Sequence, residues 1–224
     1  MNQPAYQHRA RRPSAIPDTI LALLVVNGLV FAAQMMTIYP ALGLSWVDLR
    51  FALWPPVEGT LRGWPPAIPE PGFGVWQLVS YGFLHGSLPH IAFNMFALWM
   101  FGRDIEALMG PRRFLTYFLV CVAGAGVVQL LVANLQGGFY PTVGASGGVF
   151  GILLAYGMAF PNRTIMMIFP PIPMKAKYFV ILIGLFELYI GFSGRSPGVA
   201  NFAHLGGMLF GFAMLQYWKG RRGR

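Results

Sequence analysis

The chain has 224 residues, of which 56% are hydrophobic and only 10% are charged, and its formal net charge is +9. Soluble domains carry about 25% charged residues, so this composition excludes an ordinary soluble protein. Several apolar runs approach or exceed the roughly 18 residues that mark a membrane-spanning helix. The single cysteine, Cys121, lies inside one of these runs, which excludes a disulfide framework and a cysteine metal site.

Six apolar segments are expected to be membrane-spanning helices: 19–38, 89–103, 114–133, 146–160, 176–192 and 200–218. The first follows an arginine-rich start, as in a signal peptide, but it is longer than a signal-peptide core, so we expect a retained anchor. Residues 1–18 are expected to form a cytoplasmic tail, 19–218 one helical domain and 219–224 a basic cytoplasmic tail. The predicted fold class is an all-α polytopic membrane protein with a six-helix bundle.

The first connection, about 39–88, is unusually long. It contains the following prolines and tryptophans: Pro40, Pro55, Pro56, Pro65, Pro66, Pro69 and Pro71, alongside Trp46, Trp54, Trp64 and Trp76. So many prolines exclude a single helix. Because tryptophan favours the membrane–water interface, we expect a folded loop that lies partly in the lipid headgroup layer.

Lysines and arginines predict the orientation, because cytoplasmic loops keep an excess of positive charge. If the N-terminus is cytoplasmic, only Arg50, Arg62 and Arg195 lie outside, and the other thirteen of the 16 basic residues lie inside. We therefore expect both termini in the cytoplasm, in a membrane of the bacterial inner-membrane type. The charge is split among short segments without a nucleic-acid-reading element, so topology and contact with anionic lipid explain it better than nucleic-acid binding.

The second, fourth and sixth segments each carry an unusual polar residue near their outer end. Ser146 and His204 each lie 14 residues before the inner border of their segment, and His90 lies 13 residues before its border. At about 1.5 Å per residue, all three lie at one depth, several Å below the surface of a hydrocarbon layer about 30 Å thick. Intramembrane ionisable residues usually serve function, although helix packing is the alternative for each residue taken singly.

Glycines surround the serine and follow the histidine of the sixth segment. Small-xxx-small patterns, which allow close helix approach, occur at Gly144 with Gly148, Gly147 with Gly151, and Gly207 with Gly211. His204 shares a helix face with Gly207 and Gly211, so we expect it within hydrogen-bond reach of Ser146. Ser146 also begins a helix whose free amides and dipole suit an oxyanion.

His90 and Asn94 are four residues apart and share one face of the second segment. Both can donate hydrogen bonds without carrying charge, so they are expected to supplement the backbone amide of Ser146 in an oxyanion hole. A structural hydrogen bond between this segment and the first loop is the alternative.

Three motifs resemble those of the rhomboid intramembrane serine proteases, in the family's order and over 76–217. GASGGVFG at 144–151 resembles the GxSG motif, AHLGGMLFG at 203–211 resembles AHxxGxxxG, and HIAFNMFALWMFG at 90–102 resembles HxxxN. The resemblance implies Ser146 as nucleophile, His204 as general base and then acid, and His90, Asn94 and the Ser146 amide as oxyanion donors. It also implies that His85 supports the cavity, and we expect no cofactor and no metal.

The chain departs from the family pattern at two positions. Many rhomboids have Trp-Arg where this chain has Trp76-Gln77, and many have a tyrosine stacked on the catalytic histidine where this chain has Phe150. No acidic residue is expected beside His204, because Glu187 belongs to the fifth segment, so the sequence favours a Ser–His dyad. Glu187 is expected either on the substrate path or in an interhelical hydrogen bond.

The resemblance implies single-span membrane proteins as substrates, cut in a cavity that opens to the outer side. We expect them to enter beside the fifth segment, with the loop 193–197 as a lid. Two alternatives remain. One is a rhomboid-like protein that binds membrane clients without cutting them. The other is a transporter or metal site built from His85, His90 and His204, which would leave Asn94 and Ser146 without a role.

Overall fold

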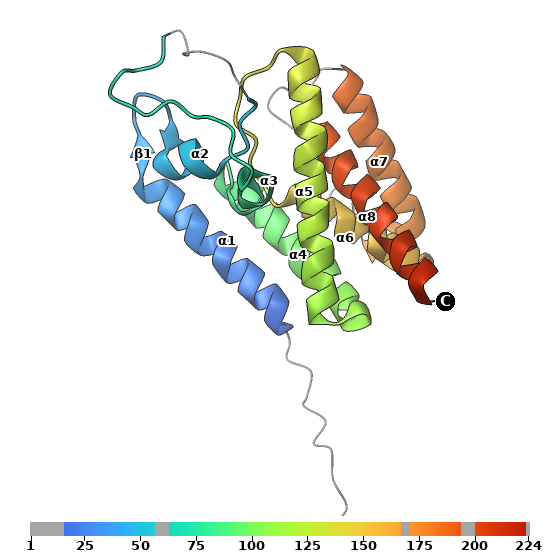
Figure 1. Ribbon diagram of the computed structural model, residues 1–224. Helices are drawn as coiled ribbons and strands as arrows, with labels where there is room; N and C mark the ends of the chain where they lie inside the picture. Colours follow the sequence, from blue (N-terminus) through green and yellow to red (C-terminus); the bar gives the residue numbers. More distant parts are fainter. Residues whose placement is uncertain (1–15, 57–62, 167–170, 194–199, 223–224) are drawn as a thin grey trace, which may run out of the picture.

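The computed structural model describes residues 16–56, 63–166, 171–193 and 200–222. Across these ranges the chain is mostly helical, and its long helices form a bundle (Figure 1): α1 (Asp18–Met36), α4 (Leu88–Met109), α5 (Pro111–Gln136), α6 (Ser146–Ala159), α7 (Ala176–Ser193) and α8 (Asn201–Arg222). All six apolar segments expected from the sequence are helical over most of their length, which confirms the helical part of that prediction. Of the expected tails, 1–15 and 223–224 lie outside the described residues.

The shortest of these helices, α6, is the innermost. It packs against α4, α5, α7 and α8, and ten of its 14 residues are buried. Its 14 residues extend about 21 Å, whereas the 26 residues of α5 extend about 39 Å. Consequently α6 extends over only part of the length of α5 (Figure 1), and its first residue, Ser146, lies in the wall of a cavity.

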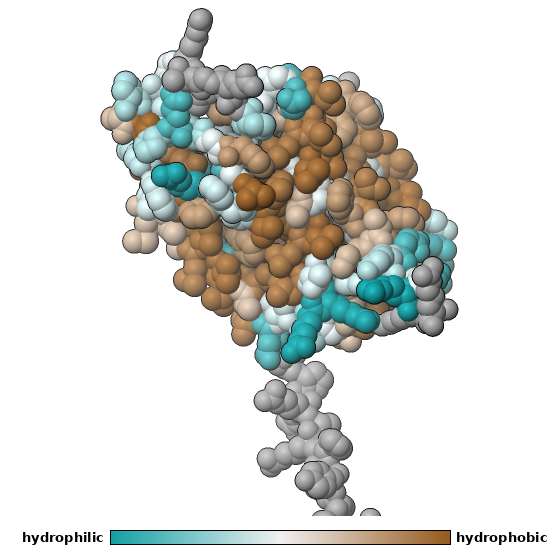
Figure 2. Space-filling view, in the orientation of Figure 1, coloured by the Kyte–Doolittle hydropathy of each residue, from teal (hydrophilic) through white to brown (hydrophobic). Residues whose placement is uncertain are grey.

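The surface of the bundle is that of a protein surrounded by lipid. The helices α1, α5 and α7 are long and apolar enough to cross a membrane. On α7 the side chains of Ile181, Leu185 and Phe186 are more than half exposed, and soluble proteins rarely expose such large apolar patches. Figure 2 shows a broad hydrophobic band across one face, with hydrophilic residues gathered at both ends.

The connection between α1 and α4 is folded, as expected, and contains several short elements. These are the antiparallel strands β1 (Ile38–Tyr39) and β2 (Leu44–Ser45), then α2 (Trp46–Phe51), α3 (Gln77–Ser80) and the 3-10 helix η1 (Tyr81–Phe83). Trp46 and Trp76 are exposed, as an interfacial position requires. Trp54, however, is buried in a small core with Leu49 and Leu84. The indole of Trp54 therefore fills the loop's own interior and does not lie on its surface.

A buried polar network joins α1 to this loop and to the start of α4. The side-chain amide of Gln34 donates to Oδ1 of Asp48 at 2.6 Å and to the carbonyl of His85 at 3.2 Å. Its Oε1 accepts the backbone N–H of His85 at 2.9 Å. Asp48 in turn forms a capping box with Ser45 at the start of α2. These bonds fix the backbone of His85, three residues before α4 begins.

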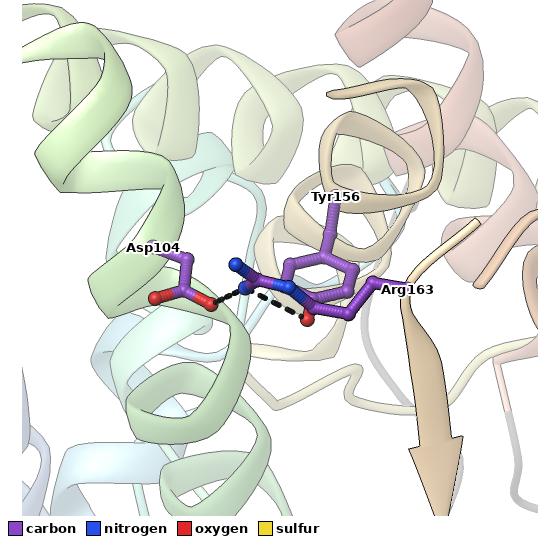
Figure 3. Close-up of polar contacts among 3 residues, drawn as sticks. All are labelled: Asp104, Tyr156 and Arg163. Atoms are coloured by element: carbon purple, nitrogen blue, oxygen red, sulfur yellow. Dashed lines mark hydrogen bonds and ion pairs between the residues drawn. The ribbon is translucent and has the colours of Figure 1, made fainter. Parts of the chain in front are cut away.

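At the other end of α4, an ion pair ties this helix to the segment after α6. Arg163 pairs with Asp104 and also donates to the hydroxyl of Tyr156 at 3.3 Å (Figure 3). Arg163 is followed by the antiparallel pair β3 (Thr164–Met166) and β4 (Pro173–Lys175), which leads into α7. Because the ion pair between Arg163 and Asp104 is partly exposed, it adds less than about 1 kcal/mol to the stability of the protein. Its role is to fix where α6 ends.

Gln77, one of the two sequence departures, is the central hydrogen-bonding group of the loop. It is 1% exposed. Its Oε1 accepts the backbone N–H of Trp54 at 3.1 Å, and its Nε2 donates to the carbonyls of Gly72 at 2.8 Å and Arg50 at 3.3 Å. A neutral amide therefore joins three loop segments without an ion pair.

We predict that Gln77→Met destabilises the protein by about 2 kcal/mol, because it leaves buried backbone groups without partners. Thermal unfolding in detergent measures the effect, with Gln136→Met, at an exposed position near the end of α5, as the matched control. Equal unfolding midpoints for the two variants would contradict this role of Gln77.

Candidate active site

Ser146 and His204 meet at the interface of α6 and α8. The Nε2 atom of His204 lies 2.9 Å from Oγ of Ser146, which is within the reach required between a nucleophile and its base. The residues are 58 positions apart in the chain, and each lies in the first turn of its helix. The predicted meeting of these two side chains is confirmed.

Glycines allow this meeting, because the helices around α6 approach without side chains between them. A Cβ built at Gly207 would lie 2.0 Å from the carbonyl oxygen of Gly147. A Cβ at Gly147 would lie 2.4 Å from Cβ of Ala125 on α5. Further glycines are similarly enclosed by side chains of α5: Gly148 by Phe118, Gly151 by Cys121 and Gly211 by Tyr117. The small-xxx-small patterns are thus the contact surfaces of α6 and α8.

The imidazole of His204 is held on its face and at its second nitrogen. The ring of Phe150 stacks on it, with centroids 4.3 Å apart and planes 5° apart, so phenylalanine supplies the ring contact expected at this position. The Nδ1 atom lies 2.9 Å from Oε2 of Glu187. The expectation that no acidic residue lies beside His204 is therefore wrong. Glu187 also accepts a hydrogen bond from Nδ2 of Asn201 at 2.6 Å, which is the interhelical bond that the sequence left open.

His90 and Gly144 lie beside the serine hydroxyl. The Nδ1 atom of His90 accepts the N–H of Gly86 at 3.3 Å, which assigns the proton of a neutral ring to Nε2. A Cβ built at Gly144 would lie 2.8 Å from that Nε2 and 3.5 Å from Oγ of Ser146. Gly144 thus keeps open a small space that faces both a donor and the hydroxyl.

Asn94 and His85 lie on either side of His90. The amide of Asn94, which is 6% exposed, donates one hydrogen bond to the carbonyl of His90 at 3.0 Å and has a second N–H. The ring of His85 meets that of His90 edge to face, with centroids 5.1 Å apart. Neither ring nitrogen of His85 has a partner among the described protein atoms, so its fixed contact is with His90.

A cavity of about 1170 Å³ extends from these groups to residues of α4 and α7. One part is polar and lined by His90, Asn94, Ser146 and His204; the other is apolar and lined by residues of α4 and α7, among them Phe93, Met100, Phe179 and Ile183. The expected lid, 193–197, lies outside the described residues beyond Ser193. Among the residues that the structure describes, no three metal-ligating side chains are grouped.

Glu187 and Asn201 are the site residues that the sequence did not assign. A carboxylate in an otherwise apolar segment is a signal of function, and Asn201 lies one turn before His204. What the sequence lacks is the direction of the carboxylate: α7 is apolar on all sides, so no polar face shows which way Glu187 points.

The chain matches the family model described as Rhomboid domain over residues 72–219. It is 33% identical over 139 residues to Rhomboid protease GluP of Bacillus subtilis, covering 61% of this chain and 25% of that protein. It is also 28% identical over 188 residues to the human mitochondrial presenilin-associated rhomboid-like protein, covering 77% and 48%. RHOMBOID-like protein 4 of Arabidopsis thaliana is 34% identical over 142 residues, covering 62% and 33%. The matched region spans between a quarter and a half of these relatives' lengths.

We predict that Gly207→Ala prevents the approach of α6 and α8, because the new methyl group would overlap the carbonyl of Gly147. The change should slow labelling of Ser146 by a fluorophosphonate at least about tenfold, as expected when a nucleophile and its base are misplaced. The control is Gly28→Ala on α1, where a Cβ meets nothing within 4 Å. Normal labelling of the Gly207 variant would show that the close approach is dispensable.

We predict that Gly144→Ala also slows this labelling, because the methyl group fills the space between His90 and Ser146. The φ of Gly144 is +133°, so strain of about 1–3 kcal/mol is added as well. Gly110→Ala separates the two effects, since Gly110 has a φ of +81° but open space around it. Both variants should be less stable, but slow labelling is expected of Gly144→Ala alone.

Proposed function

The chain belongs to the rhomboid family and is a multi-pass membrane protein, and on that premise we propose that it is an intramembrane serine endopeptidase with six membrane-spanning helices. The observation that carries the proposal is the 2.9 Å contact between Oγ of Ser146 and Nε2 of His204 in the wall of the cavity. Serine needs an adjacent base to act as a nucleophile, and this contact supplies one.

In the first half of the proposed reaction, Oγ of Ser146 attacks the carbonyl carbon of a peptide bond, and its proton passes to Nε2 of His204. The carbonyl oxygen takes up negative charge as the new C–O bond forms. The backbone N–H of Ser146, Nε2–H of His90 and the second N–H of Asn94 are proposed to donate to this oxyanion. Each lost donor in such a site reduces the rate by about 10²–10³-fold.

In the second half, the C–N bond breaks and His204 returns the proton to the departing amine. Water then attacks the acyl group on Ser146, again losing a proton to Nε2 of His204, and the acid product leaves as Oγ is reprotonated. The position of Ser146 at the inner end of a cavity supports access of water from one side, since irregular backbone at membrane depth must be buried in protein or wetted.

The cavity also supports membrane-confined substrates. Its apolar part lies between α4 and α7, whose outer surfaces face lipid, and its polar part surrounds Ser146. We propose that a single-span membrane protein places an unwound part of its segment there, since the amides of an intact helix are hydrogen-bonded and shielded. The similarity to Rhomboid protease GluP supports this proposal.

The proposed orientation places both termini in the cytoplasm and the polar part of the cavity toward the outer side, in a membrane of the bacterial inner-membrane type. Arg112 and Arg113 are exposed at the start of α5 and Arg163 follows α6. Ser146 is at the opposite end of α6 from Arg163. A positive charge excess at that end supports a cytoplasmic position.

A rhomboid-like protein that binds clients without cutting them is the second candidate, and a test of Ser146 separates the two. We predict that the purified chain cleaves members of a library of tagged single-span proteins and reacts with a fluorophosphonate. Ser146→Ala should abolish labelling and lower cleavage by at least about 10³-fold, while a chelator leaves both unchanged. Cleavage that persists in Ser146→Ala would rule out the proposed nucleophile.

A further inference from the structure

A buried carboxylate beside His204 has no role so far in the proposed reaction. Glu187 is the only acidic residue between Glu106 and the end of the chain. It lies on α7, whose other side chains are largely exposed, yet it is 7% exposed itself. Burying a carboxylate costs several kcal/mol unless partners compensate, and within a membrane helix such a group usually serves function. Its partners therefore indicate what it does.

Asn201 and His204, which both contact Glu187, belong to the first turn of α8, and both meet the same carboxylate oxygen. Nδ2 of Asn201 donates to Oε2 at 2.6 Å, and Nδ1 of His204 lies 2.9 Å from Oε2. The Nδ1 atom is buried and makes no hydrogen bond as it stands, so the carboxylate or the ring must turn for this contact to become one. On the opposite side of the ring, Nε2 meets Oγ of Ser146.

We propose that Glu187 is a positioning residue that turns the Ser146–His204 pair into a Glu–His–Ser triad. This inference rests on the proposed function. A carboxylate at Nδ1 keeps the neutral imidazole protonated on Nδ1, which leaves the lone pair of Nε2 free to accept the serine proton. When that proton has moved, the carboxylate stabilises the imidazolium and itself stays ionised.

The surroundings of His204 fit this role better than a purely structural one. Phe150 stacks on one face of the ring and fixes its plane, but stacking does not select which nitrogen carries the proton. Asn201 holds the carboxylate in place and meets the oxygen that faces Nδ1. A tether between α7 and α8 would need only an acceptor for Asn201, which a glutamine also offers. Glutamine therefore separates the two roles.

The test is Glu187→Gln in the full chain, purified in detergent and assayed on a substrate that the native chain cleaves. We expect kcat to fall by about 10²–10⁴-fold, where the upper value is that for loss of the acid in serine-protease triads, with KM nearly unchanged. The rate constant of fluorophosphonate labelling should fall in parallel, because it reports Ser146 and His204 without substrate binding. If kcat falls by less than about tenfold, the triad is overturned.

Glu106→Gln is the matched control. Glu106 is also a buried carboxylate, 5% exposed, and it accepts the backbone N–H of Ile20 at 3.3 Å. It lies 12 residues along α4 from Asn94, about 18 Å. We expect it to lower stability without changing kcat. An equal loss of kcat in both variants would assign the effect of Glu187 to folding and overturn the proposal.

A second measurement uses the native chain and does not depend on how a variant folds. In protein with ¹⁵N-labelled histidine, the ring signals of His204, identified by their loss in His204→Ala, should show the neutral ring protonated on Nδ1. A proton on Nε2 overturns the triad. The proposed function fails on a different result, namely cleavage that survives Ser146→Ala, so the two failures cannot be confused.

Discussion

The site depends on the contact between the backbones of α6 and α8. In a bilayer, helices gain little from the hydrophobic effect when they associate, because lipid is as apolar as their side chains, so close packing must hold them together. Here the carbonyl of Gly147 fills the place that a side chain at Gly207 would occupy. Ser146 precedes one of these glycines and His204 lies nearly one turn before the other. The interaction that joins the helices therefore also sets the distance between hydroxyl and imidazole.

The helices of the bundle contribute unequally to this arrangement. The most apolar stretch of α5 is 44% buried, because α5 packs against α6 and α8. The corresponding stretch of α7 is only 17% buried. Helix α7 nevertheless contributes the carboxylate beside His204. The hydrogen bond from Asn201 matters for this reason, because a loosely packed helix needs a specific polar contact to place one side chain reproducibly.

The sequence predicted how far along its helix each site residue lies. It did not predict toward which side of α7 the carboxylate of Glu187 points. Counting residues from the inner border placed Ser146, His90 and His204 at one height, because helical rise is constant. Glycine spacing then indicated which faces of α6 and α8 meet. For Glu187 neither argument applied: α7 is apolar all round, so its pattern defines no buried face. The sequence also did not show that Trp54 forms the loop's own core, because an indole suits both an interface and a small core.

The distribution of polar atoms explains how one cavity can serve both a membrane segment and a hydrolytic reaction. Hydrolysis needs water and donors at the scissile bond, whereas a membrane segment is stable only while its remaining side chains stay in apolar surroundings. The cavity divides these demands along its length: the imidazoles, amide and hydroxyl gather at the start of α6, and phenylalanine and isoleucine side chains line the part between α4 and α7. Because the 14 residues of α6 extend over only part of the length of α5, the polar part at the start of α6 lies within the bundle. A membrane segment of a substrate that entered from the apolar part would have to expose only its unwound end to the polar part of the cavity.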